Sequence, residues 1–247
     1  MNIDAILDHP EYNLRSVSRL AARDDPWTRV WLDRLDPLYG IYMQVRNRRL
    51  IIRKEFYETA FVIDRLQDEL SRVPALWELG AGHGMLGLFS SVMYPRLSRA
   101  TLIDQHKPSS YERIREHLAV RFPYVKVRTR FIEGKIQDAV DIPPGALVVG
   151  VHACGALTDR VVETAAAAGA DFAVVPCCEA KRLLPLEVRR ETPPGCVPQA
   201  VAEMRLARWR GMGYAVEERA LPEAVTGRGR IFIGRAPTPG SPLQKSW

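Results

Sequence analysis

Residues 75–87 read Ala75-Leu-Trp-Glu-Leu-Gly-Ala-Gly-His-Gly-Met-Leu-Gly87, and this stretch decides the fold. An apolar run ends at Leu79, glycines stand at 80, 82 and 84, and a second apolar run begins at Met85. Because glycine has no Cβ atom, it permits a tight turn and a close approach of a ligand to the backbone. The N–H groups at the start of the next helix can bind an anion. The stretch therefore predicts a strand, a ligand-binding turn and a helix.

The alternation of strands and helices continues along the chain. Apolar runs predict strands at 75–78, 100–103, 125–132, 146–151 and 172–175, with helices at 85–93, 109–121, 158–168 and 199–211. Two further runs, 214–220 and 230–234, have no room for a helix between them and should form an antiparallel hairpin at one sheet edge. We therefore expect an α/β, Rossmann-like fold with a mostly parallel seven-stranded sheet covered on both faces.

Composition is that of an ordinary globular protein. The 247 residues are 47% hydrophobic and 26% charged, with a net charge of +6. Residues 1–10 contain Asp4 and Asp8 and no apolar segment, and no run reaches the ~18–20 apolar residues of a membrane span. We expect a cytoplasmic protein without a membrane partner. The four cysteines are too few for a disulfide framework and are expected to be thiols.

The region before the glycine turn has a helical pattern. Apolar residues recur at three- and four-residue spacing within 27–35 and 55–70, so residues 1–72 are expected to form a helical cap ahead of the main domain at 73–235. Residues 236–247 are rich in Pro, Gly and Ser and are expected to form a flexible tail. Residues 43–54 carry basic side chains and no acidic one: Arg46, Arg48, Arg49, Arg53 and Lys54. This strip is either a solvated face or a contact for phosphates.

Two cofactors suit the glycine turn. The spacing Gly82-x-Gly84-x-x-Gly87 matches a dinucleotide-binding fingerprint. The longer pattern Glu78-x-Gly80-x-Gly82-x-Gly84 resembles motif I of the class I S-adenosylmethionine (SAM) methyltransferases. The C-terminal hairpin, which that family has, and the lack of a second substrate domain favour SAM. The resemblance implies cofactor contacts from the following residues of the turn: Glu78, Gly80, Ala81, Gly82 and Gly84.

Two further positions are candidates for contacts with the adenosine of the cofactor. Asp104 ends the predicted second strand, where a carboxylate can accept hydrogen bonds from the ribose hydroxyls of either cofactor. Many class I enzymes place an Asp after the third strand for the adenine amino group, but this chain has Gly134-Lys135 there. Gln137, Asp138 or backbone groups are expected to take over that contact.

Polar residues follow the predicted fourth and fifth strands. They are His152-Ala-Cys154-Gly-Ala-Leu-Thr-Asp159 and Pro176-Cys177-Cys178, and the ends of parallel strands should bring them together beside the cofactor. With Arg53-Lys54-Glu55, these motifs resemble the methyltransferase-domain family that includes the eukaryotic tRNA acceptor-stem ribose 2′-O-methyltransferases. The resemblance implies an RNA substrate. However, the Cys/His zinc modules of the tRNA enzymes are absent from this chain, and we expect no metal site.

The sequence leaves open the roles of the residues that follow the fourth and fifth predicted strands. His152 is the natural general base because imidazole titrates near neutral pH, but it could also serve only to bond the backbone. His152 is also a candidate for contact with the cofactor. Cys154 is a second catalytic candidate, and Cys177 and Cys178 are candidates for substrate contact. The cysteines could instead be buried packing residues, metal ligands or redox-active thiols.

Four functions follow in order of preference. The first is a SAM-dependent methyltransferase that acts on RNA, at a ribose 2′-oxygen. The second is a SAM-dependent methyltransferase of a small metabolite or thiol, with residues 1–72 as a lid. A non-catalytic module that binds SAM or a nucleotide comes third, and an NAD-dependent oxidoreductase comes last.

Overall fold

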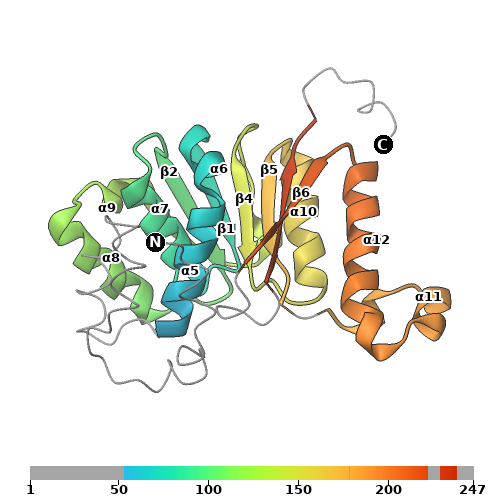
Figure 1. Cartoon of the computed structure of the whole chain (residues 1–247). Coiled ribbons are helices and arrows are strands. Elements are labelled where there is room, and N and C mark those ends of the chain that lie inside the picture. The colour runs from blue at the N-terminus through green and yellow to red at the C-terminus, as the bar shows by residue number, and fades with distance from the viewer. Residues whose placement is uncertain (1–52, 178, 222–228, 238–247) are drawn as a thin grey trace, which may run out of the picture.

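The computed structural model describes residues 53–177, 179–221 and 229–237. Within them, seven strands form one sheet in the order β3-β2-β1-β4-β5-β7-β6 (Figure 1). The strands are β1 (Ala75–Leu79), β2 (Arg99–Asp104), β3 (Thr129–Glu133), β4 (Leu147–Val151), β5 (Asp171–Val175), β6 (Ala215–Ala220) and β7 (Arg230–Arg235). The first five are parallel, and β7 pairs antiparallel with both β5 and β6. The expected α/β sheet with a C-terminal antiparallel hairpin is confirmed.

Helices cover both faces of the sheet (Figure 1). One face carries α5 (Arg53–Arg65), α6 (Gln67–Arg72), α7 (Met85–Met93), α8 (Ser109–Arg121) and α9 (Val125–Arg128). The other carries η2 (Ile136–Asp138), α10 (Ala156–Ala168) and α12 (Val197–Gly211). Successive side chains of a strand enter opposite cores: Leu76 packs with the first group and Trp77 with the second. The strands are therefore buried on both faces, as a parallel sheet requires.

The helices before β1 belong to the same core as the sheet. The sequence predicts one helix over 55–70, but the structure has α5 and α6 with a break at Leu66. Ala60, Ile63 and Leu70 are fully buried in the cluster that also contains Leu88 of α7. Residues 60–70 of the expected cap thus pack in the same core as α7. Most of the expected cap, Arg46, Arg48 and Arg49 included, lies outside the described residues, as do Cys178 and the tail from 238.

One predicted strand is wrong in its first half. Residues 125–128 form the short helix α9, and β3 begins only at Thr129. The strand β2 starts at Arg99, and its Ala100 pairs with Thr129. Residues 125–127 therefore lie beyond the start of β2, and the chain turns back onto Tyr124 instead, with the Arg128 N–H donating to its carbonyl at 2.9 Å. The alternating apolar pattern of residues 125–132 does not by itself form a strand where no partner strand is present.

The segment between β5 and α12 contains short helices that the sequence pattern did not indicate. They are η3 (Lys181–Leu183), α11 (Leu186–Glu191) and η4 (Pro194–Cys196), and they lie beside the start of α12 (Figure 1). No helix in the described part of the chain is long and apolar enough to cross a membrane.

Candidate active site

The glycine turn is fastened to the end of the neighbouring strand β2. The N–H groups of Gly80 and Ala81 donate to the carbonyl of Ile103 at 2.8 and 3.0 Å, and the N–H of Gly82 donates to Asp104 Oδ2 at 2.8 Å. Asp104 Oδ1 makes no hydrogen bond with the described residues. The carboxylate of Asp104 thus holds the turn with one oxygen and keeps the other available for a ligand hydroxyl.

Two glycines of the turn are required for different reasons. Gly82 and Gly84 both have positive φ angles, 50° and 69°, which glycine adopts without strain. A Cβ on Gly84 would come within 2.5 Å of the Leu102 side chain, so this position permits close packing of the turn on β2. A Cβ on Gly82 would meet no atom within 4 Å. Gly82 therefore borders open space, where a ligand can approach the backbone.

Glu78 supports the turn from inside the protein. The side chain is buried, and its Oε2 accepts a hydrogen bond from the Gly87 N–H at 2.8 Å. Burial raises the pKa of Glu78 from 4.5 to about 8, and the nearby charge of Asp104 adds to the effect. A buried carboxyl that is protonated near neutral pH loses its proton when a cation binds beside it, because the cation stabilises the negative carboxylate. SAM carries an ammonium and a sulfonium group, so the turn, Glu78 and the free oxygen of Asp104 fit this cofactor.

The ends of β4 and β5 meet as the sequence predicts. The N–H of His152 donates to the carbonyl of Val175 at 3.0 Å, and Cys154 and Cys177 form a disulfide with their Cα atoms 5.5 Å apart. The expectation that these two cysteines are thiols is wrong for this structure, because the two loops bring them within bonding distance. Cys154 is also exposed, so it is not a buried packing residue. As half of a disulfide, it has no thiol with which to act as a nucleophile.

A buried arginine fixes the loop after β4. Arg205 of α12 is 1% exposed, and its guanidinium donates to both carboxylate oxygens of Asp159 at 3.0 and 2.9 Å. It also donates to the Gly155 carbonyl at 2.7 Å. Asp159 was part of the motif after β4, but its partner could not be found by sequence reasoning, because Arg205 lies 46 residues away on an otherwise ordinary helix.

Two glutamates of α5 face two histidines of the site. Glu58 Oε2 lies 3.2 Å from His152 Nε2, and Glu55 Oε2 lies 3.6 Å from His83 Nε2 in the glycine turn. His83 Nδ1 is 2.5 Å from Ser110 Oγ at the start of α8. Sequence reasoning missed both pairs. The available signal was the three-residue spacing of Glu55 and Glu58, which places them on one face of a helix.

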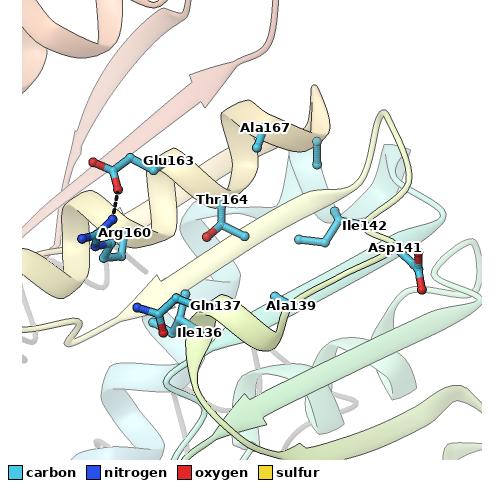
Figure 2. A pocket seen from close by; sticks show the side chains of 10 residues that line it. Ile136, Gln137, Ala139, Asp141, Ile142, Arg160, Glu163, Thr164 and Ala167 are labelled. Carbon is cyan, nitrogen blue, oxygen red and sulfur yellow. Dashed lines mark hydrogen bonds and ion pairs between the residues drawn. The ribbon is translucent and has the colours of Figure 1, made fainter.

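The candidates for the adenine contact lie after β3. Asp138 Oδ2 accepts a hydrogen bond from the Lys135 N–H at 2.6 Å and so stabilises the turn into η2. Gln137 lines a groove of about 480 Å³ between η2 and α10 (Figure 2). Arg160 and Glu163 of α10 form an ion pair of 3.0 Å at the same groove. Asp138 is thus engaged in its own turn, whereas the Gln137 side chain lies on the lining of a ligand-sized groove.

A family model described as a methyltransferase domain matches residues 53–182. The chain belongs to this family. It is a SAM-dependent methyltransferase with SAM as its cofactor. The match begins at the first residue of α5, in agreement with the shared core of α5, α6 and the sheet.

Solved structures that match this chain do so at low sequence identity and with TM-scores below 0.5. A precorrin-6y C5,15-methyltransferase from Geobacter metallireducens has 14% identity and a TM-score of 0.47, with 73% of this chain and 87% of that chain covered. A protein from Corynebacterium glutamicum has 15% identity and a TM-score of 0.49, with 92% and 97% covered. The 16S rRNA methyltransferase KamB has 18% identity and a TM-score of 0.49, with 71% and 94% covered. No curated protein gives a significant match to this chain.

Proposed function

We propose that this methyltransferase modifies RNA at a ribose 2′-oxygen. The observation that carries the proposal is a basic segment attached directly to the corner formed by β4 and β5. This basic segment has four cationic residues, Lys181, Arg182, Arg189 and Arg190 in η3 and α11, against two acidic ones, Glu187 and Glu191 of α11. The Arg182 guanidinium is exposed and lies 4.0 Å from the point where a Cβ of Gly155 would stand, next to the motif after β4. Positive side chains beside the reacting centre suit a phosphate backbone.

The basic segment is held in a defined shape. The Arg189 side chain donates to the carbonyls of Arg182 and Leu184 at 2.8 and 2.9 Å, which ties α11 back to η3. Leu184 is buried against Val201 of α12. The segment therefore presents its charges from a packed structure, so fewer side chains must be ordered when a ligand binds.

His152 is the residue that suits a hydroxyl acceptor. When bound, SAM supplies a methyl group already activated on a positively charged sulfur. A hydroxyl must lose its proton as it attacks, and His152 at the end of β4 is the general base in this proposal. The cofactor would be held by the turn residues Gly80, Ala81 and Gly82, with Glu78 and Asp104. Gln137 would lie beside the adenine of the cofactor.

The remaining candidates contact the acceptor in this proposal. The basic strip at 46–54, whose members Arg53 and Lys54 begin α5, would extend the phosphate contacts. Cys177 and Cys178 would border the acceptor ribose on the side of β5. We assign Cys154 to the structure of this corner, through its bond to Cys177, and not to catalysis.

The test is transfer of a labelled methyl group from SAM into the RNA, protein and metabolite fractions of the source cell. Label in RNA that survives alkaline hydrolysis as a dinucleotide identifies a 2′-O-methyl group, because the modified ribose cannot assist cleavage. Label in mononucleotides would move the acceptor to a base. Label confined to metabolites would replace RNA by a small acceptor, the second function weighed from the sequence.

A pair of charge reversals tests the basic segment. Arg182→Glu should weaken RNA binding and lower the slope of log affinity against log salt by about 1 to 2, as expected when one phosphate contact is lost and a repulsion is added. Arg113→Glu makes the same charge change at an exposed position of α8 and should leave the slope unchanged. Equal effects of the two variants would contradict a phosphate contact at Arg182.

A further inference from the structure

His152 and Glu58 meet across the site from distant parts of the chain. Glu58 Oε2 on α5 lies 3.2 Å from His152 Nε2 after β4. The Glu58 side chain is 8% exposed, whereas the His152 side chain is 36% exposed. Nε2 itself is buried and makes no hydrogen bond of standard geometry with the described residues, so its contact with Glu58 is one of ion-pair distance. The buried nitrogen of the ring therefore faces the carboxylate, and the rest of the ring faces outward.

The backbone of His152 is held as firmly as its ring. Its φ angle is +56°, in the left-handed region, where a non-glycine residue is strained. The N–H bonds to Val175, and Cys177 Sγ lies 3.4 Å from the His152 carbonyl oxygen. Such a conformation persists only where the surroundings impose it. The local fold thus directs this ring toward Glu58.

We propose that Glu58 is the positioning residue for the general base, and that it makes Nδ1 of His152 the atom that takes the proton of the acceptor. A carboxylate beside Nε2 stabilises the tautomer that carries its proton on Nε2. Nδ1, which makes no hydrogen bond with the described residues, then holds the lone pair. This inference rests on the proposed function, in which the acceptor is a hydroxyl.

The proton and electron balance of the step is simple. The hydroxyl oxygen of the acceptor forms a bond to the methyl carbon, and its proton passes to Nδ1 of His152. The electron pair of the broken carbon–sulfur bond stays on the sulfur, which becomes a neutral thioether. One positive charge leaves the sulfur and one appears on the imidazolium. Glu58 stabilises that new charge through the N–H at Nε2.

The second pair on α5 provides a matched control. Glu55 and His83 have the same residue types one helical turn away, and the His83 side chain is 38% exposed. The separation of Glu55 Oε2 and His83 Nε2 is 3.6 Å, and the Glu55 side chain is 36% exposed. A change at Glu55 therefore removes the same group from the same helix without touching the neighbour of His152.

The experiment is to read the tautomer of His152 from the ¹⁵N shifts and proton couplings of its ring, in the full chain at a pH where the ring is neutral. The proton should lie on Nε2 in the unmodified protein. In Glu58→Leu the two tautomers should become mixed, whereas Glu55→Leu should leave the His152 signals unchanged. If the proton is found on Nδ1 in the unmodified protein, the proposal is overturned. This measurement needs no variant, so it decides the question even if Glu58→Leu does not fold.

Activity provides a separate measurement. With the acceptor found by methyl labelling, Glu58→Gln should lower kcat about 10- to 100-fold, as loss of a supporting carboxylate does elsewhere, with SAM affinity by calorimetry unchanged. Glu58→Asp should recover part of the loss. An unchanged kcat in Glu58→Gln would overturn the proposal. If the Nε2 tautomer is found but RNA takes no label, the RNA substrate fails while the positioning role stands for another hydroxyl acceptor.

Discussion

The buried carboxyl of Glu78 makes the stability of the protein depend on pH in an unusual direction. Its pKa is about 8 in the folded protein, against 4.5 in an unfolded chain. Between these values the folded state keeps the proton that the unfolded state has lost, so the free energy of unfolding falls as pH rises. At about 1.4 kcal/mol for each pH unit, the loss is roughly 3 kcal/mol by pH 7 and roughly 5 kcal/mol above pH 9.

The substitution Glu78→Gln removes this titration and keeps the shape of the side chain. The amide carbonyl can still accept the hydrogen bond from the Gly87 N–H. Urea unfolding at a series of pH values, without cofactor, should give equal stability for both proteins near pH 4.5. The variant should become the more stable one by several kcal/mol near pH 9.

A matched substitution at the surface separates this effect from the general loss of a carboxylate. The pKa of Glu112 is lowered, mainly by its hydrogen bond with Lys107, so Glu112 is ionised in both states above pH 5. Glu112→Gln should therefore shift the stability by a constant amount from pH 5 to pH 9. If the free energy of unfolding changed with pH in the same way for Glu78→Gln and for the unmodified protein, the reasoning would be refuted. The buried carboxyl would then have the same pKa in the folded and the unfolded protein.

Three further predictions concern the cofactor site and the loop after β4. Asp104→Ala should weaken SAM binding by ~1–3 kcal/mol in calorimetry, because an acceptor for the ribose and a support of the turn are lost; unchanged affinity would contradict that assignment. Alkylation followed by mass spectrometry should label the exposed Cys196 without reductant, and Cys154 and Cys177 only after reduction. Labelling of all three without reductant would show that the disulfide is absent. Arg205→Met should lower the free energy of unfolding by about 3 kcal/mol in urea, because it leaves the partly buried carboxylate of Asp159 without its partner, and a loss under 1 kcal/mol would argue against the pair.

Local pattern was sufficient for the elements that lie around the turn. The predicted helices at 85–93 and 109–121 have the bounds of α7 and α8, because their apolar spacing and their flanking turns are both encoded nearby. The same approach failed at 125–128, where strand formation depended on whether β2 extended far enough to pair. It also gave no indication of η3 and α11, whose short apolar runs lack a periodic pattern.

Other features depended on contacts between residues far apart in the chain. Arg205 with Asp159, Cys154 with Cys177, and Glu58 with His152 join segments that no local spacing relates. The sequence singled out His152, Cys154 and Cys177, but Arg205 and Glu58 stand in ordinary helical patterns. The packing of α12 and α5 against the sheet gives Asp159 and His152 their partners, and the pairing of β4 with β5 brings the two cysteines together.

The sequence by itself determined the order of strands and helices, the glycine turn after the first strand and the meeting of the two polar motifs at the ends of β4 and β5. These follow from backbone preferences and from the periodic burial of side chains, which act over a few residues. The tertiary structure decided which carboxylate accompanies the histidine, which nitrogen of its ring faces outward and whether two cysteines are joined. Those choices depend on distances of a few ångströms between separate elements, and such distances exist only after the helices have packed on the sheet.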